Sequence, residues 1–289
     1  LNYDMISDGI VRFAAGLGKK VLIANQCGLL WDEIYSYGGN IPALMAWTGA
    51  IAFTFQIYYD FSGYSDMAIG LGHMFGFSFP ENFNYPYYAV SVSDFWRRWH
   101  ITLSSFFRDY LYIPLGGNRK NWALNMLIVW LLTGLWHGAS WNFVLWGLYY
   151  FVFLMLEKMY IGKILEKLPR AVGHIYSLIV IIIGWVFFYF DDLSKIKYFF
   201  KAAFGAANGF VTLTEKTVIV NYAVLLIIGA VCAMPLLPPI KNFACSLSKT
   251  RSGKVTVDVL SVLFVIFSLA ISTASLVGNS YNPFLYFRF

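Results

Sequence analysis

Two histidines are the side chains in this sequence whose type and setting best suit chemistry. His100 and His137 each follow a tryptophan, and each lies in or beside a strongly apolar segment. An imidazole among apolar segments costs free energy unless it is hydrogen-bonded or put to use. We therefore expect the stretch that holds both histidines, residues 94–142, to contain the functional site.

His137 has the surroundings of a general base. It stands between Trp136 and Trp141, at the end of an apolar run. Burial disfavours the charged imidazole, and a neutral imidazole near pH 7 is suited to accept a proton. Such a base could take the proton of a hydroxyl group while that oxygen attacks a thioester. The alternative is a packed histidine that is hydrogen-bonded to a carbonyl group, and the residues alone leave both open.

The polar neighbours of the two histidines suggest a binding role. His100 follows two arginines and could act as a second acid or base, orient a donor, or anchor the chain at lipid headgroups. Arg97 and Arg98 could bind the phosphate of an acyl donor or that of a lipid. Asp94 lies four residues before Arg98, a spacing that predicts an ion pair on one helix face. Asn142 closes the stretch, and we class Asp94 and Asn142 as supporting residues.

Two carboxylates interrupt an earlier apolar run. Asp60 and Asp66 follow residues 43–59 and precede a glycine-rich helical segment at 67–77. An acidic residue at membrane depth is a functional candidate that faces a cavity or a partner. The alternative is that both acids cap or brace a break between two helices. Either reading makes them supporting residues, and we expect a helix break at 60–66.

Composition places the chain in the membrane. Of 289 residues, 59% are hydrophobic and 12% are charged, whereas soluble domains average about 25% charged. The formal net charge of +6 is scattered over short loops, without the basic stripe that follows a nucleic-acid backbone. We therefore exclude nucleic acid as a partner and expect contact with membrane lipid.

The sequence lacks the motifs that several other catalytic mechanisms require. The sequence has no HExxH, CxxC, Walker lysine loop or Gly-x-Ser-x-Gly motif. The three cysteines, Cys27, Cys232 and Cys245, are too far apart for a zinc or disulfide framework. We predict neither a metal site nor a bound cofactor.

Hydrophobic patterning predicts an all-α, polytopic membrane protein with one domain over residues 1–289. The segment 92–112 is too charged to span and suits an amphipathic or re-entrant helix at the interface. Two prolines make residues 79–87 irregular. Helices are predicted at 8–26, 43–59, 67–77, 122–136 and 141–159, with a bend at 138–140, and further spans at 172–190, 218–238 and 255–278.

The motifs around the histidines resemble those of the membrane-bound O-acyltransferase (MBOAT) family, and within it the alginate O-acetylase branch. Residues 113–119 favour this branch over the related teichoic-acid D-alanylation proteins. The residues that carry the resemblance lie at 59–66, 80–83, 94–100, 107–110, 135–138 and 282–287.

The resemblance implies a helical fold around a membrane tunnel and a reaction at the two histidines. His137 in the Trp-His-Gly motif is then the catalytic residue, and His100 is the second required position. The branch also implies a cytoplasmic thioester donor such as acetyl-CoA, an extracytoplasmic acetyltransferase partner and a polysaccharide acceptor. Compared with the family, we expect this sequence to be the C-terminal part of such a protein, without several N-terminal spans.

We therefore predict a multi-pass O-acetyltransferase of the cytoplasmic (inner) membrane that serves O-acetylation of an exported polysaccharide. Arg97 and Arg98 are assigned to the donor side, with Asp60 and Asp66 bracing the core or orienting a histidine. One alternative is D-alanyl transfer toward teichoic acid, which would depend on a carrier protein. The other is a transporter or flippase in which the acids and histidines form a proton path, without acyl transfer.

Overall fold

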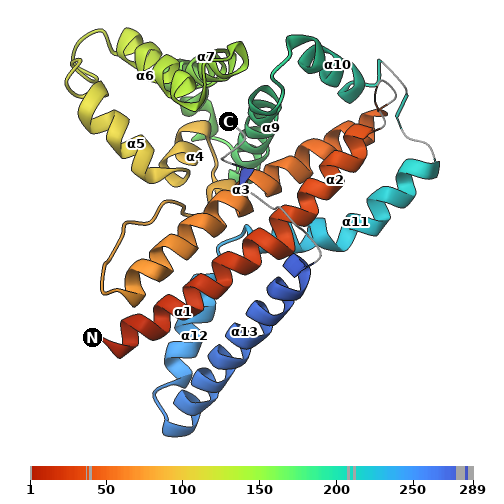
Figure 1. Ribbon diagram of the computed structural model, residues 1–289. Coiled ribbons are helices and arrows are strands. Elements are labelled where there is room, and N and C mark those ends of the chain that lie inside the picture. Colours follow the sequence, from red (N-terminus) through yellow and green to blue (C-terminus); the bar gives the residue numbers. More distant parts are fainter. Residues whose placement is uncertain are drawn as a thin grey trace. The chain divides into compact units, whose positions relative to one another are not determined.

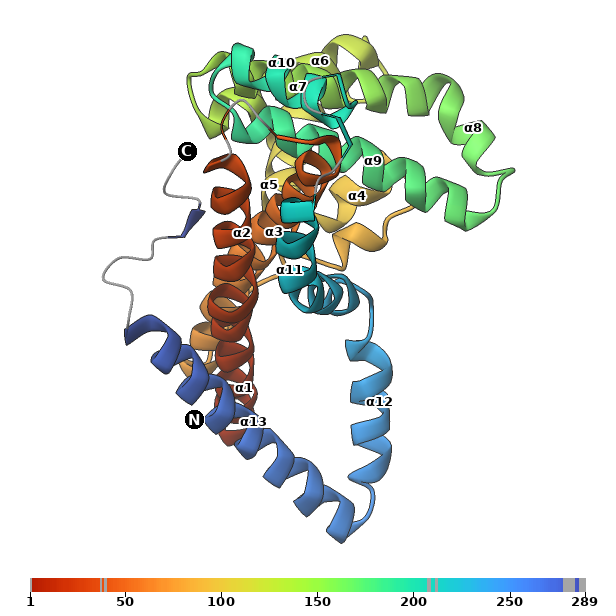
Figure 2. The same cartoon turned by 90° about the vertical axis from the view of Figure 1, so that its right-hand side faces the viewer.

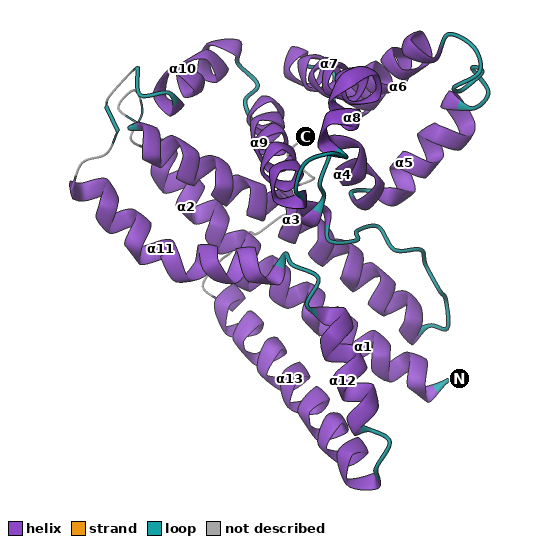
Figure 3. Cartoon of the chain, turned by 180° about the vertical axis from the view of Figure 1, so that it is seen from behind, coloured by secondary structure: helices purple, strands orange, loops and turns teal. Residues whose placement is uncertain are grey.

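The computed structural model describes residues 2–36, 38, 41–206, 209–210, 213–277 and 284–285. Within these residues the chain is helical and contains no strand, as Figure 3 shows. The all-α prediction is therefore confirmed. Contacts group the chain into two compact units: unit 1 comprises Leu1–Leu29, Phe55–Glu81 and Leu225–Arg288, and unit 2 comprises Leu30–Thr54, Asn82–Val224 and Phe289. The single domain over 1–289 stays a prediction.

Unit 2 is built from short and long helices that follow one another along the chain (Figure 1). Four of them, α4, α5, α6 and α7, carry the stretch singled out by its histidines. The helices that lie wholly in this unit are α4 (Val92–Arg98), α5 (Ile101–Phe107), η3 (Arg108–Tyr112), α6 (Trp122–His137), α7 (Trp141–Leu156), η4 (Glu157–Ile161), α8 (Gly162–Leu165), α9 (Arg170–Tyr189) and α10 (Leu193–Ala203), with the short η2 (Pro86–Tyr88) before them. The unit also contains the end of α2 (Asn25–Ser36), the first part of α3 (Ala43–Met74) and the first part of α11 (Leu213–Cys232).

Helices α6 and α7 form a tightly packed hairpin. A Cβ atom at Gly134 would lie 2.4 Å from the carbonyl oxygen of Phe143, and one at Gly147 would lie 2.4 Å from that of Trp130. Only glycine lets two helix backbones approach this closely. The helix predicted at 122–136 and the bend at 138–140 are both confirmed. The hairpin places His137 at the turn between its two arms.

The amphipathic segment 92–112 is divided, where the sequence suggested a single helix. Helix α4 begins after Ser91, whose hydroxyl accepts a hydrogen bond from the backbone amide of Asp94 at 3.0 Å. It ends at Arg98, with Trp99 as its C-cap, and His100 adopts a left-handed backbone with φ of 45° before α5 begins. A left-handed φ stops a helix, so the break lies at the residue that carries the imidazole.

Unit 1 packs long helices through glycine. Its elements are α1 (Tyr3–Gly18), η1 (Lys19–Ala24), the start of α2 (Asn25–Ser36), the second half of α3 (Ala43–Met74), the end of α11 (Leu213–Cys232), α12 (Leu237–Leu247) and α13 (Arg251–Val277). Gly9 and Gly16 of α1 face Gly70 and Gly63 of α3, where an added Cβ would lie 2.6 Å from a carbonyl oxygen. Helix α13 contacts α1 and crosses it obliquely, as Figure 2 shows.

The helix break expected at 60–66 is wrong. Helix α3 runs without interruption from Ala43 to Met74, through both acids. The acids need no break because η1 supplies cations: Lys20 pairs with Asp60, and Lys19 pairs with Asp66 at 2.6 Å. Paired carboxylates leave the backbone hydrogen bonds of the helix intact, so the apolar run continues past them.

Three helices are long and apolar enough to cross a membrane: Trp141–Leu165, Arg170–Tyr189 and Arg251–Val277. A fourth span arises if Lys216–Cys232 and Leu237–Leu247, bent by 69°, count as one. The span predicted at 218–238 is thus wrong in its end, because α11 ends at Cys232. The predicted spans 172–190 and 255–278 agree with α9 and α13.

Candidate active site

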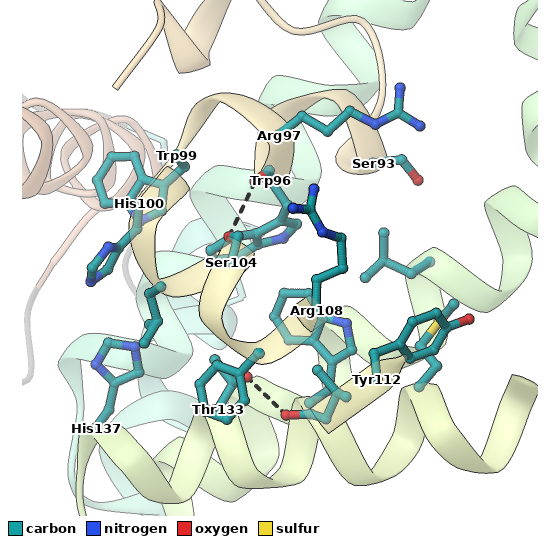
Figure 4. A pocket seen from close by; sticks show the side chains of 16 residues that line it. Ser93, Trp96, Arg97, Trp99, His100, Ser104, Arg108, Tyr112, Thr133 and His137 are labelled. Atoms are coloured by element: carbon teal, nitrogen blue, oxygen red, sulfur yellow. Dashed lines mark hydrogen bonds between the residues drawn. The ribbon is translucent and has the colours of Figure 1, made fainter. Parts of the chain in front are cut away.

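A cavity of about 280 Å³ in unit 2 contains both histidines in its wall. Helices α4, α5 and α6 supply most of the lining, so the break after α4 and the end of α6 meet at one site. In Figure 4 the two imidazoles lie at one end of the cavity, and Arg108 and Tyr112 lie toward the other. The polar lining residues are Ser93, Arg97, His100, Ser104, Arg108, Tyr112, Thr133 and His137.

His137 is held by aromatic packing. Its ring centroid lies 5.0 Å from that of Phe188 and 5.2 Å from that of Trp146, both edge-on. Across the described part of the chain, no residue hydrogen-bonds to the His137 imidazole, so packing alone sets its orientation. An imidazole in this setting is free to exchange a proton with a group that enters the cavity.

His100 is held by hydrogen bonds and by an indole that contacts both imidazoles. Its Nδ1 lies 3.2 Å from Oδ1 of Asn82. The ring of Trp136 has its centroid 5.9 Å from that of His100 and 4.9 Å from that of His137. Burial lowers the pKa of His100 to about 4, because a charged imidazole loses its hydration there. The ring is therefore neutral at ordinary pH.

The two arginines predicted together on the donor side face different partners. Arg97 lines the cavity. Arg98 donates to Asp94 at 2.8 Å and to the backbone oxygen of Asn84 at 3.4 Å. The ion pair predicted from the spacing of Asp94 and Arg98 is thus present. Arg108 also lines the cavity and pairs with Asp109 at 2.7 Å, and the sequence analysis did not select it.

Asn142 stabilises the wall behind His137. It is buried near the start of α7, and its Nδ2 donates to the backbone oxygen of Phe188 at 3.2 Å. Since the ring of Phe188 packs against His137, this bond ties α7 to the part of α9 that supports the imidazole. Asn142 acts on the site through packing.

Asp60 and Asp66 belong to unit 1, and neither is among the described residues that line the cavity. Asp60 pairs with Lys20 and also accepts the backbone amide of Leu285 at 2.8 Å. Asp66 accepts hydrogen bonds from Lys19 at 2.6 Å and from Arg12 at 2.9 Å. Their described contacts therefore join α3 to α1 and η1.

Glu157 is a site-supporting residue that the sequence analysis missed. Its buried carboxylate accepts the backbone amides of Val92 at 2.6 Å and Ser93 at 2.9 Å, and the hydroxyl of Ser93 at 2.7 Å. An acid at the start of a helix satisfies free amides and favours the helix dipole. A lone acid within the apolar run 141–159 was the available signal, by the criterion that selected Asp60.

Comparison with known proteins places this site in a family. A relative from Azotobacter vinelandii, named "Probable alginate O-acetylase AlgI", is 35% identical over 99% of this chain and 63% of its own length. A peptidoglycan O-acetyltransferase of Helicobacter pylori is 40% identical over 71% of this chain and 40% of its own. A teichoic acid D-alanyltransferase of Bacillus subtilis is 34% identical over 35% of this chain and 28% of its own.

The chain thus spans less than two thirds of the length of these relatives. The family model described as "MBOAT, membrane-bound O-acyltransferase family" matches residues 34–200, which include the cavity and both histidines. The match covers more than half of the sequence. The helices long enough to span a bilayer agree with a membrane protein. The chain belongs to the membrane-bound O-acyltransferase family.

Proposed function

We propose that this chain carries the acyl-transfer site of a membrane-bound O-acetyltransferase that serves O-acetylation of an exported polysaccharide. The observation that carries the proposal is the meeting of His100 and His137 at one end of a cavity of about 280 Å³. Two relatives are named for O-acetyl transfer to alginate and to peptidoglycan, which supports a polysaccharide acceptor.

In the proposed reaction, His137 is the general base. Its ring nitrogen takes the proton of an acceptor hydroxyl while the hydroxyl oxygen forms a bond to the acyl carbon of the thioester. The carbon–sulfur bond breaks, and the leaving thiolate takes the proton back from the imidazolium. His100, neutral and at the same end of the cavity, contacts the reacting groups as a hydrogen-bonding partner.

The other end of the cavity suits the donor. Arg97 and Arg108 both line it, and guanidinium groups bind phosphate through paired hydrogen bonds. A cytoplasmic thioester that carries phosphate, such as acetyl-CoA, fits this charge. The whole protein is then a multi-pass enzyme of the inner membrane, and an extracytoplasmic acetyltransferase partner completes delivery to the polysaccharide.

The test uses the full-length protein in its native cells. We expect His137→Gln to remove ester-linked acetate from the exported polysaccharide while membrane abundance stays unchanged. His73→Gln is the matched control, because His73 lies at the end of α3 and does not line the cavity. Wild-type acetylation in the His137→Gln strain would refute the mechanism.

D-alanyl transfer is the second candidate, favoured by the D-alanyltransferase relative. It predicts ester-linked D-alanine in place of acetate, so both esters are quantified in the same hydrolysate. The transporter alternative predicts proton-driven substrate movement that persists without ester formation. Loss of acetate alone, with transport of the unmodified polysaccharide intact, supports the acetyltransferase proposal over both.

A further inference from the structure

Asn82 is a buried amide whose oxygen faces His100 and Thr102. Its Oδ1 lies 3.2 Å from Nδ1 of His100, 2.9 Å from Oγ1 of Thr102 and 3.3 Å from the backbone nitrogen of Thr102. Asn82 precedes His100 by 18 residues and lies in the irregular segment before η2. The side-chain oxygen of Asn82 is thus within hydrogen-bonding distance of both the imidazole of His100 and Thr102.

The contacts of that oxygen decide where the proton on His100 lies. A backbone N–H only donates, so the atom that faces the amide of Thr102 is the oxygen of Asn82 and not its NH₂ group. A carbonyl oxygen only accepts, so Nδ1 of His100 carries the hydrogen. In a neutral imidazole the second nitrogen, Nε2, then holds the lone pair. The other tautomer would set two acceptors against each other at 3.2 Å.

The same segment holds the backbone of the His100 turn. The carbonyl oxygen of Asn82 accepts the amide of Ile101 at 3.0 Å, and the amide of Asn84 donates to the carbonyl of Arg98 at 2.9 Å. His100 between them has a φ of 45°, which is unfavourable for a side chain with a Cβ. The backbone groups of Asn82 and Asn84 therefore stabilise both sides of a strained turn, and the side chain of Asn82 contacts its imidazole.

We infer that Asn82 is a positioning residue that keeps His100 in the Nδ1–H tautomer, so that Nε2 of His100 presents its lone pair as the acceptor in the acyl-transfer site. The inference rests on the proposed function and adds that the two histidines have different roles: His137 is the general base, and His100 is a hydrogen-bond acceptor with a fixed tautomer. His137 has no described hydrogen-bonding partner that selects a tautomer, whereas His100 has one. Burial, which lowers the pKa of His100 to about 4, keeps that lone pair unprotonated across the working pH range.

The decisive variant is Asn82→Asp. A carboxylate oxygen keeps the three hydrogen bonds of Oδ1, so the fold and the tautomer are preserved. Its negative charge stabilises the imidazolium and raises the pKa of His100. We expect acetyl transfer to fall about tenfold or more at pH 6 and to recover toward the wild-type rate at pH 8. Asn82→Leu, which removes the acceptor, should lower the rate by about tenfold or more at every pH, as loss of an orienting partner does.

The rates are measured as transfer of labelled acetate from acetyl-CoA in membranes of the native cells, from pH 5.5 to 8.5, with the full-length protein quantified in each sample. Asn84→Asp is the control, since Asn84 is exposed and the variant adds the same charge two residues away. An Asn82→Asp profile that coincides with the wild-type profile overturns the inference, whatever Asn82→Leu does. If His137→Gln leaves acetylation intact, the proposed function fails as well. If His137→Gln abolishes it and Asn82→Asp shows no shift, only this inference fails.

Discussion

The carboxylate of Glu157 accepts the backbone amide of Val92 at 2.6 Å, joining the end of α7 to the start of α4. The same group accepts the amide and hydroxyl of Ser93, so one buried acid satisfies three donors. Since α4 ends at the His100 turn, Glu157 fixes from a distance the helix that leads to the site. A glutamate in an apolar segment is thus explained by the hydrogen bonds that it accepts from the first residues of α4.

Replacing Glu157 with glutamine should destabilise the protein and lower acetyl transfer. A carboxamide has one oxygen and one NH₂ group, so one of the N–H donors would face a second donor. Loss of a buried partner of this kind costs about 1–3 kcal/mol of unfolding free energy. The check is the thermal midpoint of the purified full-length protein in detergent, together with ester-linked acetate in cells. Glu166→Gln, at an exposed position, is the control, and an unchanged midpoint for Glu157→Gln would contradict the role.

Alanine at Gly147 should push α6 away from α7. The added Cβ would lie 2.4 Å from the carbonyl oxygen of Trp130, a backbone atom that cannot rotate aside. Overpacking of this kind costs about 1–3 kcal/mol and displaces the helix that ends at His137. We expect a lower thermal midpoint and reduced acetylation. Gly18→Ala is the comparison, because the nearest atom there is the rotatable hydroxyl of Ser268 at 3.1 Å. Equal effects of the two variants would speak against the tight α6–α7 contact.

The pKa of His100 predicts an acid-dependent stability. In the unfolded chain a histidine binds a proton below about pH 6.5, whereas His100 in the folded protein does so only below about pH 4. Between those values the unfolded state binds more protons, so stability falls as pH is lowered from 6.5 to 4. The loss is on the order of 3 kcal/mol, at about 1.4 kcal/mol for each pH unit.

The measurement compares thermal midpoints at pH 7 and pH 4.5 for the wild type and for His100→Asn. Asparagine accepts a left-handed φ and does not titrate, so it keeps the backbone and removes the proton. The wild type should lose more stability than the variant over this range. Parallel curves would show that His100 is not the group responsible.

Neutralising Asp60 should be costly because its partner is buried. Asp60→Asn removes the negative charge that pairs with the ammonium group of Lys20, and both side chains are almost fully buried. Breaking a buried pair on one side costs about 3–5 kcal/mol, whereas replacing both partners by apolar residues can be neutral. Lys20→Met with Asp60→Leu should therefore be more stable than Asp60→Asn. Asp191→Asn, at an exposed pair, serves as the control in the same thermal assay.

Local patterns predicted much of the helical architecture. The bounds of α6 were predicted to within one residue from the apolar run that begins at Trp122 and from the turn at Gly138. Both ends could be predicted because helix capping and bending depend on residues that are neighbours in the sequence. The ion pair of Asp94 with Arg98 follows from helix spacing in the same way. Both histidines could be singled out from the sequence because burial of an imidazole is an unusual cost, and both line one cavity. Their catalytic roles stay predictions.

Partners far apart in the sequence explain what could not be predicted. Helix α3 continues through Asp60 because Lys20 neutralises its charge. The residues next to Asp60 in the sequence give no sign that a lysine 40 positions earlier will pair with it. Asn82 and Glu157 were missed for the same reason, since each acts on a segment at least 18 residues away. Spacing alone also could not separate Arg97 from Arg98, because one residue along a helix turns a side chain by about 100°.

The ion pair of Lys20 with Asp60 also bears on how the protein is made. The two residues are 40 positions apart, with Lys20 the earlier. At a synthesis rate of about 5–20 residues per second, the lysine leaves the ribosome roughly 2–8 seconds before the aspartate does. An ammonium group cannot settle into an apolar interior without a counter-charge over that time. The helix that contains Lys20 therefore has to wait, at the aqueous edge of the bilayer or within the insertion machinery, until the second half of α3 arrives and both enter together.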